Sequence, residues 1–80
     1  MDRFFIEFMK TEPVYDGLTV VRHLSRRGKK SFEARDAAHA VEKLTRHVQR
    51  HNQANTVAVQ RVWRKNADGW DDVTEDGRAL

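Results

Sequence analysis

The residues of this chain that are best suited to binding chemistry are cations, and they lie in two segments. The first segment holds Arg26, Arg27, Lys29 and Lys30. The second places a basic stripe on one face of a predicted helix, formed by His39, Lys43, Arg46 and Arg50. Concentrated long cations can bind phosphates or acidic protein surfaces, and the ordinary alternative is a solvated surface. The candidate binding residues are therefore Arg26, Arg27, Lys29, Lys30, Lys43, Arg46 and Arg50.

Two tryptophans form a second candidate site. Trp63 and Trp70 flank a predicted hairpin turn over residues 65–69, so they are expected to lie close together on neighbouring strands. Exposed aromatic rings of this kind can stack on bases or anchor a protein interface. The alternative is that both rings pack in the core or stabilise the strand pair.

Other chemistry is not indicated. The acidic cluster Asp68, Asp71, Asp72, Glu75 and Asp76 lacks the ligand spacing of a calcium loop. His47 and His51 are four residues apart, but a zinc site needs further ligands and the glutamate of the zincin motif is missing. We recognise no nucleophile–histidine pattern and no glycine-rich phosphate loop. We therefore expect a protein that is not an enzyme and holds neither metal nor cofactor.

The elements that must position these residues follow from hydrophobic periodicity. Strands are predicted over residues 3–10, 18–24, 30–34, 56–64 and 70–74, with one helix over about 36–51. A loop is expected over residues 11–17, at the only proline, and a basic hairpin loop over 25–29, where Gly28 can turn the chain. The order β-β-β-α-β-β predicts an α+β fold, with a single antiparallel β-sheet and the helix packed on one face.

The helix has both ends and a core face marked in the sequence. Asp36 is the expected N-cap, and Asn52 or Asn55 could end the helix in the left-handed conformation. The apolar stripe that should lie on the sheet comprises Ala37, Val41, Leu44 and Val48, with Ala40 beside it. Residues 75–80 are expected to fray.

Length and charge narrow the class of protein. Eighty residues make a single domain, 1–80, and the chain has no cysteine for disulfides. Residues 22–50 carry a net charge of +6, from nine Lys/Arg against three acids, whereas residues 66–80 carry −4. No apolar run is long enough to cross a membrane and the start is not a signal peptide. We expect a cytoplasmic protein, in the host cytoplasm if it is phage-encoded.

Two family resemblances reach these residues. The segment from Gly28 to Ala40, GKKSFEARDAAHA, resembles the strand-to-helix junction of the arm-type DNA-binding domains of phage integrases, a likeness that spans residues 1–50. There, a three-stranded sheet precedes a helix and enters a DNA groove. In size and layout, the whole chain is similar to small accessory proteins of phages and mobile elements, including anti-CRISPR inhibitors. That resemblance implies a steric inhibitor or adaptor and assigns no residue roles.

Three functions are compatible with this sequence. The favoured one is a non-enzymatic binding module, in which the basic helix and hairpin dock on an anionic protein or nucleoprotein partner such as a host defence complex. The first alternative is direct DNA or RNA binding. The second is a structural module that forms a homodimer through a sheet edge or the open sheet face. The partner, oligomeric state and strand order are left open by the residues.

Overall fold

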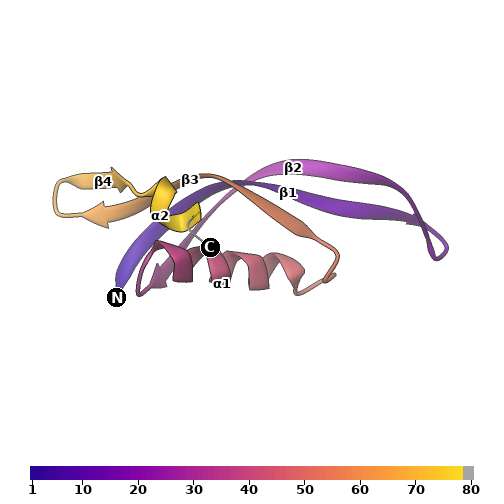
Figure 1. The fold of residues 1–80 in the computed structure, drawn as a ribbon, viewed down its shortest axis with the longest axis horizontal. Helices are drawn as coiled ribbons and strands as arrows, with labels where there is room; N and C mark the ends of the chain where they lie inside the picture. Colours follow the sequence, from indigo (N-terminus) through magenta and orange to yellow (C-terminus); the bar gives the residue numbers. More distant parts are fainter. Residues whose placement is uncertain (79–80) are drawn as a thin grey trace.

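The computed structural model describes residues 1–78, which form one antiparallel sheet with a long helix on one face. In chain order the elements are β1 (Asp2–Asp16), β2 (Thr19–Ala34), α1 (Ala37–Gln49), β3 (Thr56–Asn66), β4 (Gly69–Asp72) and α2 (Thr74–Arg78). The strands are arranged β2-β1-β3-β4, so β2 and β4 are the edges (Figure 1). The predicted α+β class and helix-covered antiparallel sheet are confirmed.

The core lies between α1 and one face of the sheet. Alternate residues of β1 point toward the helix, because successive side chains of a strand face opposite ways. Phe4, Ile6 and Phe8 are buried on this helix side, and Val62 of β3 joins them. The apolar stripe of α1 covers these residues as predicted, through Ala37, Ala40, Val41, Leu44 and Val48. The opposite face of the sheet, called here the open face, has no helix over it (Figure 1).

Two long strands precede α1, where the sequence predicted three short ones. Residues 11–17 and 25–29, both predicted loops, lie largely or wholly within β1 and β2, whose single turn is at Gly17, with φ of 63°. Pro13 fits because the last β3 pairing to β1 is at Thr11, so the strand beyond it borders only β2. The basic hairpin predicted at Arg26–Lys30 is therefore wrong, and those four cations lie along an edge strand.

The far end of the β1–β2 hairpin projects beyond the rest of the fold. We call residues 12–24 the arm (Figure 1). It makes the molecule elongated, with extents of 50 × 19 × 17 Å. Its large apolar side chains are exposed rather than packed, namely Tyr15, Leu18, Val20, Val21 and Leu24.

Polar side chains define the ends of α1. Asp36 is the N-cap, as predicted, and its carboxylate accepts from the His39 backbone N–H at 2.8 Å. At the other end, no described non-glycine residue has positive φ, so neither asparagine takes the left-handed conformation. Instead, buried Asn55 donates through Nδ2 to the Val48 carbonyl at 3.2 Å.

The C-terminal segment is more ordered than predicted. A frayed end was expected over residues 75–80, but residues 74–78 form α2 and pack against β3 and α1. A side chain on Gly77 would come within 2.8 Å of Val62 Cγ2, so this close approach requires glycine. Residues 79–80 lie outside the described part of the chain.

Candidate functional site

The structure places a hollow lined by cations where the second half of α1 meets β1 and β2. We call it the basic hollow; its basic lining residues are Lys10, Arg26, Lys30, His47 and His51, and Arg27 borders it although its side chain is on the opposite face of the strand. Its volume is about 270 Å³, and Phe8, Gly28 and Val48 also line it. Strand register explains the arrangement, because Arg26 lies opposite Lys10 and Lys30 lies opposite Ile6, which puts both cations on the helix side.

Positive charge in the basic hollow is largely uncompensated. Lys10 pairs with Glu12, with 2.6 Å between Nζ and Oε1, and this ion pair lowers the pKa of Glu12. Arg26 and Lys30 have no carboxylate within ion-pair distance among residues 1–78. Burial lowers the pKa of His47, and the positive charges of Lys30 and Arg50 lower it further. The hollow therefore disfavours additional positive charge and would be stabilised by an anion.

The four clustered cations of β2 divide between the two faces of the sheet. Arg26 and Lys30 are on the helix side, whereas Arg27 lies opposite Met9 and Lys29 opposite Glu7 on the open face. All four are exposed. β2 therefore presents positive charge on both of its faces as well as along the sheet edge.

The predicted basic stripe of α1 is mostly engaged within the protein. Lys43 donates through Nζ to the Glu33 carbonyl at 2.6 Å, and Arg46 forms an ion pair with Glu42 one turn away. His39 accepts through Nδ1 from the Arg35 backbone N–H. Arg50 lies near the basic hollow, close enough to depress the pKa of His47. The stripe and the β2 cations thus meet only at the C-terminal end of α1.

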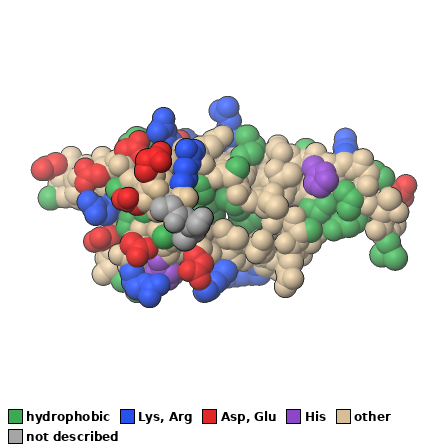
Figure 2. All heavy atoms as spheres, viewed as in Figure 1, with side chains coloured by type: hydrophobic (Ala, Val, Ile, Leu, Met, Phe, Trp, Pro, Cys, Tyr) green, Lys and Arg blue, Asp and Glu red, His purple; other side chains and the backbone are tan. Residues whose placement is uncertain are grey.

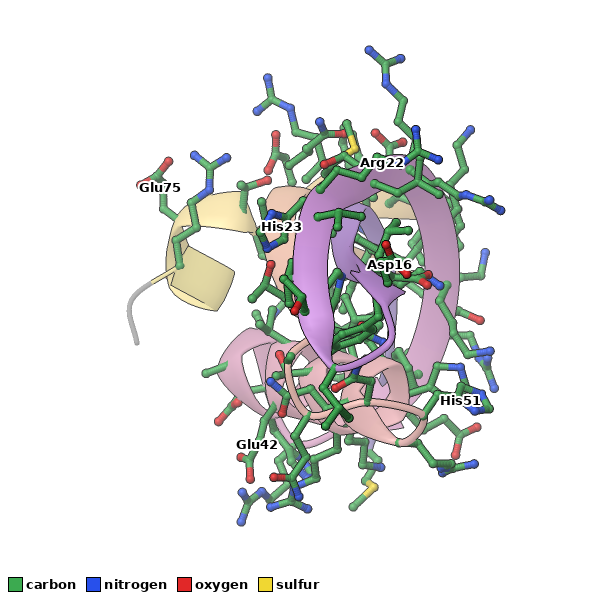
Figure 3. The ribbon with its side chains drawn as sticks, turned by 90° about the vertical axis from the view of Figure 1, so that its right-hand side faces the viewer. Asp16, Arg22, His23, Glu42, His51 and Glu75 are labelled. Atoms are coloured by element: carbon green, nitrogen blue, oxygen red, sulfur yellow. The ribbon has the colours of Figure 1, made fainter. Side chains whose placement is uncertain are left out.

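Acidic side chains are concentrated at one end of the molecule, the end that carries β4 and α2, where cations also lie (Figure 2). Viewed from the arm end, His51 lies on the β2 side of the molecule and Glu75 on the α2 side (Figure 3). Two of these acids, both in β4, are paired with cations of β3, in Arg61–Asp72 and Arg64–Asp71. The acidic end and the basic hollow are therefore separate surfaces.

Three aromatic residues form a second hollow on the open face. We call Phe5, Trp63 and Trp70 the aromatic platform; they line a hollow of about 440 Å³. Phe5 and Trp63 are paired across β1 and β3, and the Phe5 and Trp70 ring centroids are 6.0 Å apart. Both tryptophans lie outside the core, with Trp63 half-buried and Trp70 44% exposed. The two tryptophans share a face, although Trp70 is paired with Lys65 rather than with Trp63.

Some residues of both sites were not among the predicted binding residues. The sequence pattern indicates His47 and His51 only as possible metal ligands, and it does not single out Lys10. The four-residue spacing of His47 and His51 does indicate that they belong to one surface, because residues 47 and 51 fall on the same side of a helix. Phe5 was placed on the face opposite Phe4, but only strand order could show that Trp63 is its neighbour.

Comparisons with known proteins add no further constraint. Searches against family models, curated proteins and solved structures found no match. Within residues 1–78, no group of three or more His, Cys, Asp or Glu side chains is arranged to hold a metal ion. None of the described helices has the length and apolar character needed to cross a membrane.

Proposed function

We propose that this protein is a non-enzymatic module that binds nucleic acid through a basic strip. The strip combines Lys10 of β1 and the clustered cations of β2 with the basic side chains near the end of α1. Its members are Lys10, Arg26, Arg27, Lys29, Lys30, His47, Arg50 and His51. One observation carries the proposal. The four clustered cations of β2, Arg26, Arg27, Lys29 and Lys30, form no ion pair within the described chain, and they continue into the basic hollow.

The distribution of charge favours a phosphate backbone over a compact acidic site. A strand rises about 3.3 Å per residue, so residues 26–30 spread their cations over about 13 Å. Nucleic acid presents closely spaced phosphates and releases counterions when cations neutralise them. Because β2 is an edge strand, a long polyanion can reach these side chains from the side as well as from either face.

An anionic protein partner, as in the inhibitor or adaptor hypothesis, would use the same cations. The two hypotheses differ in how the affinity depends on salt concentration and in whether binding requires nucleic acid. Fluorescence anisotropy with a labelled 20-nucleotide DNA or RNA of random sequence, at two or more salt concentrations, tests the proposal. We expect binding at low salt, with log affinity falling linearly as log salt concentration rises.

Matched variants identify the surface. Arg26→Gln with Lys30→Gln removes two charges from the strip, and Arg35→Gln with Arg46→Gln removes two charges elsewhere. The strip variant should bind about tenfold more weakly or worse, with the salt slope reduced by about 2, whereas the control should change little. Absence of binding at low salt, or equal losses in both variants, would refute the proposal. Capture of an acidic protein after nuclease treatment would instead support the protein-inhibitor hypothesis.

A further inference from the structure

We infer that the aromatic platform is a base-stacking site for single-stranded nucleic acid. This inference rests on the proposed function, because the basic strip would supply the backbone contacts. It goes further by naming the strandedness of the ligand and assigning the open face to its bases. The residues that would contact bases are Phe5, Trp63 and Trp70.

The platform has the shape and composition that stacking requires. Its three rings come from β1, β3 and β4, so hydrogen-bonded strands position them. The hollow of about 440 Å³ is lined by these aromatic residues alone. Trp70 is 44% exposed on a sheet face that carries no helix. Stacking on such rings tolerates any base, because every base has a π-face.

Two cations, Lys65 and Arg61, border the platform on the open face, where the carboxylates of Glu7 and Asp72 also lie. Lys65 Nζ is 5.3 Å from the centroid of the Trp70 ring, in a cation–π arrangement. Arg61 is two residues from Trp63 and therefore shares its face, and its ion pair with Asp72 is more than half exposed on the Arg61 side. Phosphates of a strand whose bases stack on the platform would therefore meet positive side chains at its margin.

The open face also connects the platform with the basic strip. Lys29 lies opposite Glu7, which is two residues from Phe5 along β1. Lys29 is thus about 7 Å along the strand from the level of Phe5 and one strand away. Arg27 follows on the same face, opposite Met9. A single strand can pass from β2 across these cations to the platform, whereas a duplex keeps its bases stacked inside and cannot supply them.

The charges beside the platform favour a nucleic-acid strand over an apolar ligand. An apolar peptide or a second copy of the platform would bring its own surface against Arg61 and Lys65, and a second copy would bring a second set of the same cations. In a nucleic-acid strand, the bases can stack on the rings while the phosphates pair with the cations. The chemistry at the site therefore favours a polyanion with aromatic groups.

Intrinsic fluorescence reads this site directly, because the chain has only two tryptophans and both belong to the platform. The experiment titrates the full chain with three ligands of equal length: a single strand, its duplex, and an abasic single strand. We expect the single strand to quench tryptophan emission and bind at least fivefold more tightly than the abasic strand. Equal affinity and equal emission with the two single strands would overturn the inference.

Variants separate stacking from charge. Trp70→Ala should weaken single-strand binding about fivefold to one-hundredfold and leave abasic binding unchanged, while Trp70→Phe should retain much of the affinity. Leu18→Ala, at an exposed position in the arm, is the matched control for loss of an apolar side chain. An unchanged affinity in Trp70→Ala would overturn the inference. So would a wild-type dimer, seen by sedimentation, that Trp70→Ala dissociates. If the strip variant is still impaired in either case, the proposed function stands without the platform.

Discussion

Gly28 shows how a single residue can indicate the wrong element. Between two pairs of cations it reads as a hairpin glycine, yet it lies inside β2 opposite Phe8. A Cβ at this position would be 2.5 Å from Phe8 Cζ and 2.8 Å from Cε2. The ring of Phe8 thus lies across the glycine, and the residue provides space for the core rather than a turn.

Substitution of Gly28 by alanine should therefore destabilise the fold. The added methyl group would displace the buried Phe8 ring, at a cost of about 1–2 kcal/mol. For a domain of this size, that corresponds to a melting temperature lower by roughly 4–16 °C. Thermal or urea unfolding followed by circular dichroism measures the effect. Lys29→Ala, on the opposite face of the same strand, serves as the control. Equal stability of Gly28→Ala and the control would contradict the assigned contact.

At the scale of elements, the helix was predictable and the strand boundaries were not. The 3.6-residue stripe and Asp36 placed α1 within a residue or two, because both signals act within the helix itself. The continuity of β1 and β2 depends on pairing between strands, which Pro13 and Gly28 obscure when each is considered alone. The unpredicted helix α2 likewise forms through tertiary contacts, since five residues do not make a stable helix by themselves.

Thr74 joins α2 to the sheet, and its hydroxyl is the key group. Oγ1 accepts from the Val62 backbone N–H at 3.0 Å and donates to Asp72 Oδ1 at 2.5 Å. Thr74→Val would leave the buried Val62 N–H without a partner and should destabilise the protein by about 1–3 kcal/mol. Thr74→Ser keeps the hydroxyl and is the matched control. Urea unfolding at pH 7 compares the variants, and similar losses for valine and serine would contradict this role.

The same bonds make this junction sensitive to acid. Hydrogen bonds from Thr74 lower the pKa of Asp72, with Arg61 contributing further. Because the folded-state pKa lies below the ordinary value of 3.8, the stabilisation is complete above about pH 4 and is lost as pH falls through the lowered pKa. The difference in stability between wild type and Thr74→Val should therefore narrow below pH 4.

At the scale of the whole molecule, shape and charge are both polarised. The radius of gyration of 14.1 Å exceeds the value of about 12 Å for a compact chain of this length, because the arm projects from the body. The uneven charge along the sequence indicated a basic surface but could not show its composition. Strand pairing brings Lys10 beside Arg26, and helix packing adds His47, two effects that depend on contacts between distant residues.

This grouping of charges predicts that binding depends on pH through His47. In the free protein, burial and the cations Lys10, Lys30, Arg50 and His51 lower its pKa below the ordinary 6.5, and Glu12, paired with Lys10, is the acid in that group. A phosphate in the basic hollow would favour the protonated ring and raise that pKa, so binding takes up protons. Affinity should therefore increase as pH falls through the region around and below 6.5, by up to about tenfold per unit of pKa difference between free and bound protein.

The pH dependence can be assigned to this histidine by substitution. Anisotropy titrations at pH 5.5 and pH 8, at one ionic strength, measure the change in affinity for a single-stranded oligonucleotide. His47→Gln should remove most of the increase at low pH, whereas His39→Gln, at the other end of α1, should retain it. The stability of the free protein should instead decrease as pH falls below 6.5, because the pKa of His47 is lower in the folded state than in the unfolded state. Equal pH dependence in the two variants would mean that a group other than His47 titrates on binding, and the electrostatic role assigned to His47 would then be wrong.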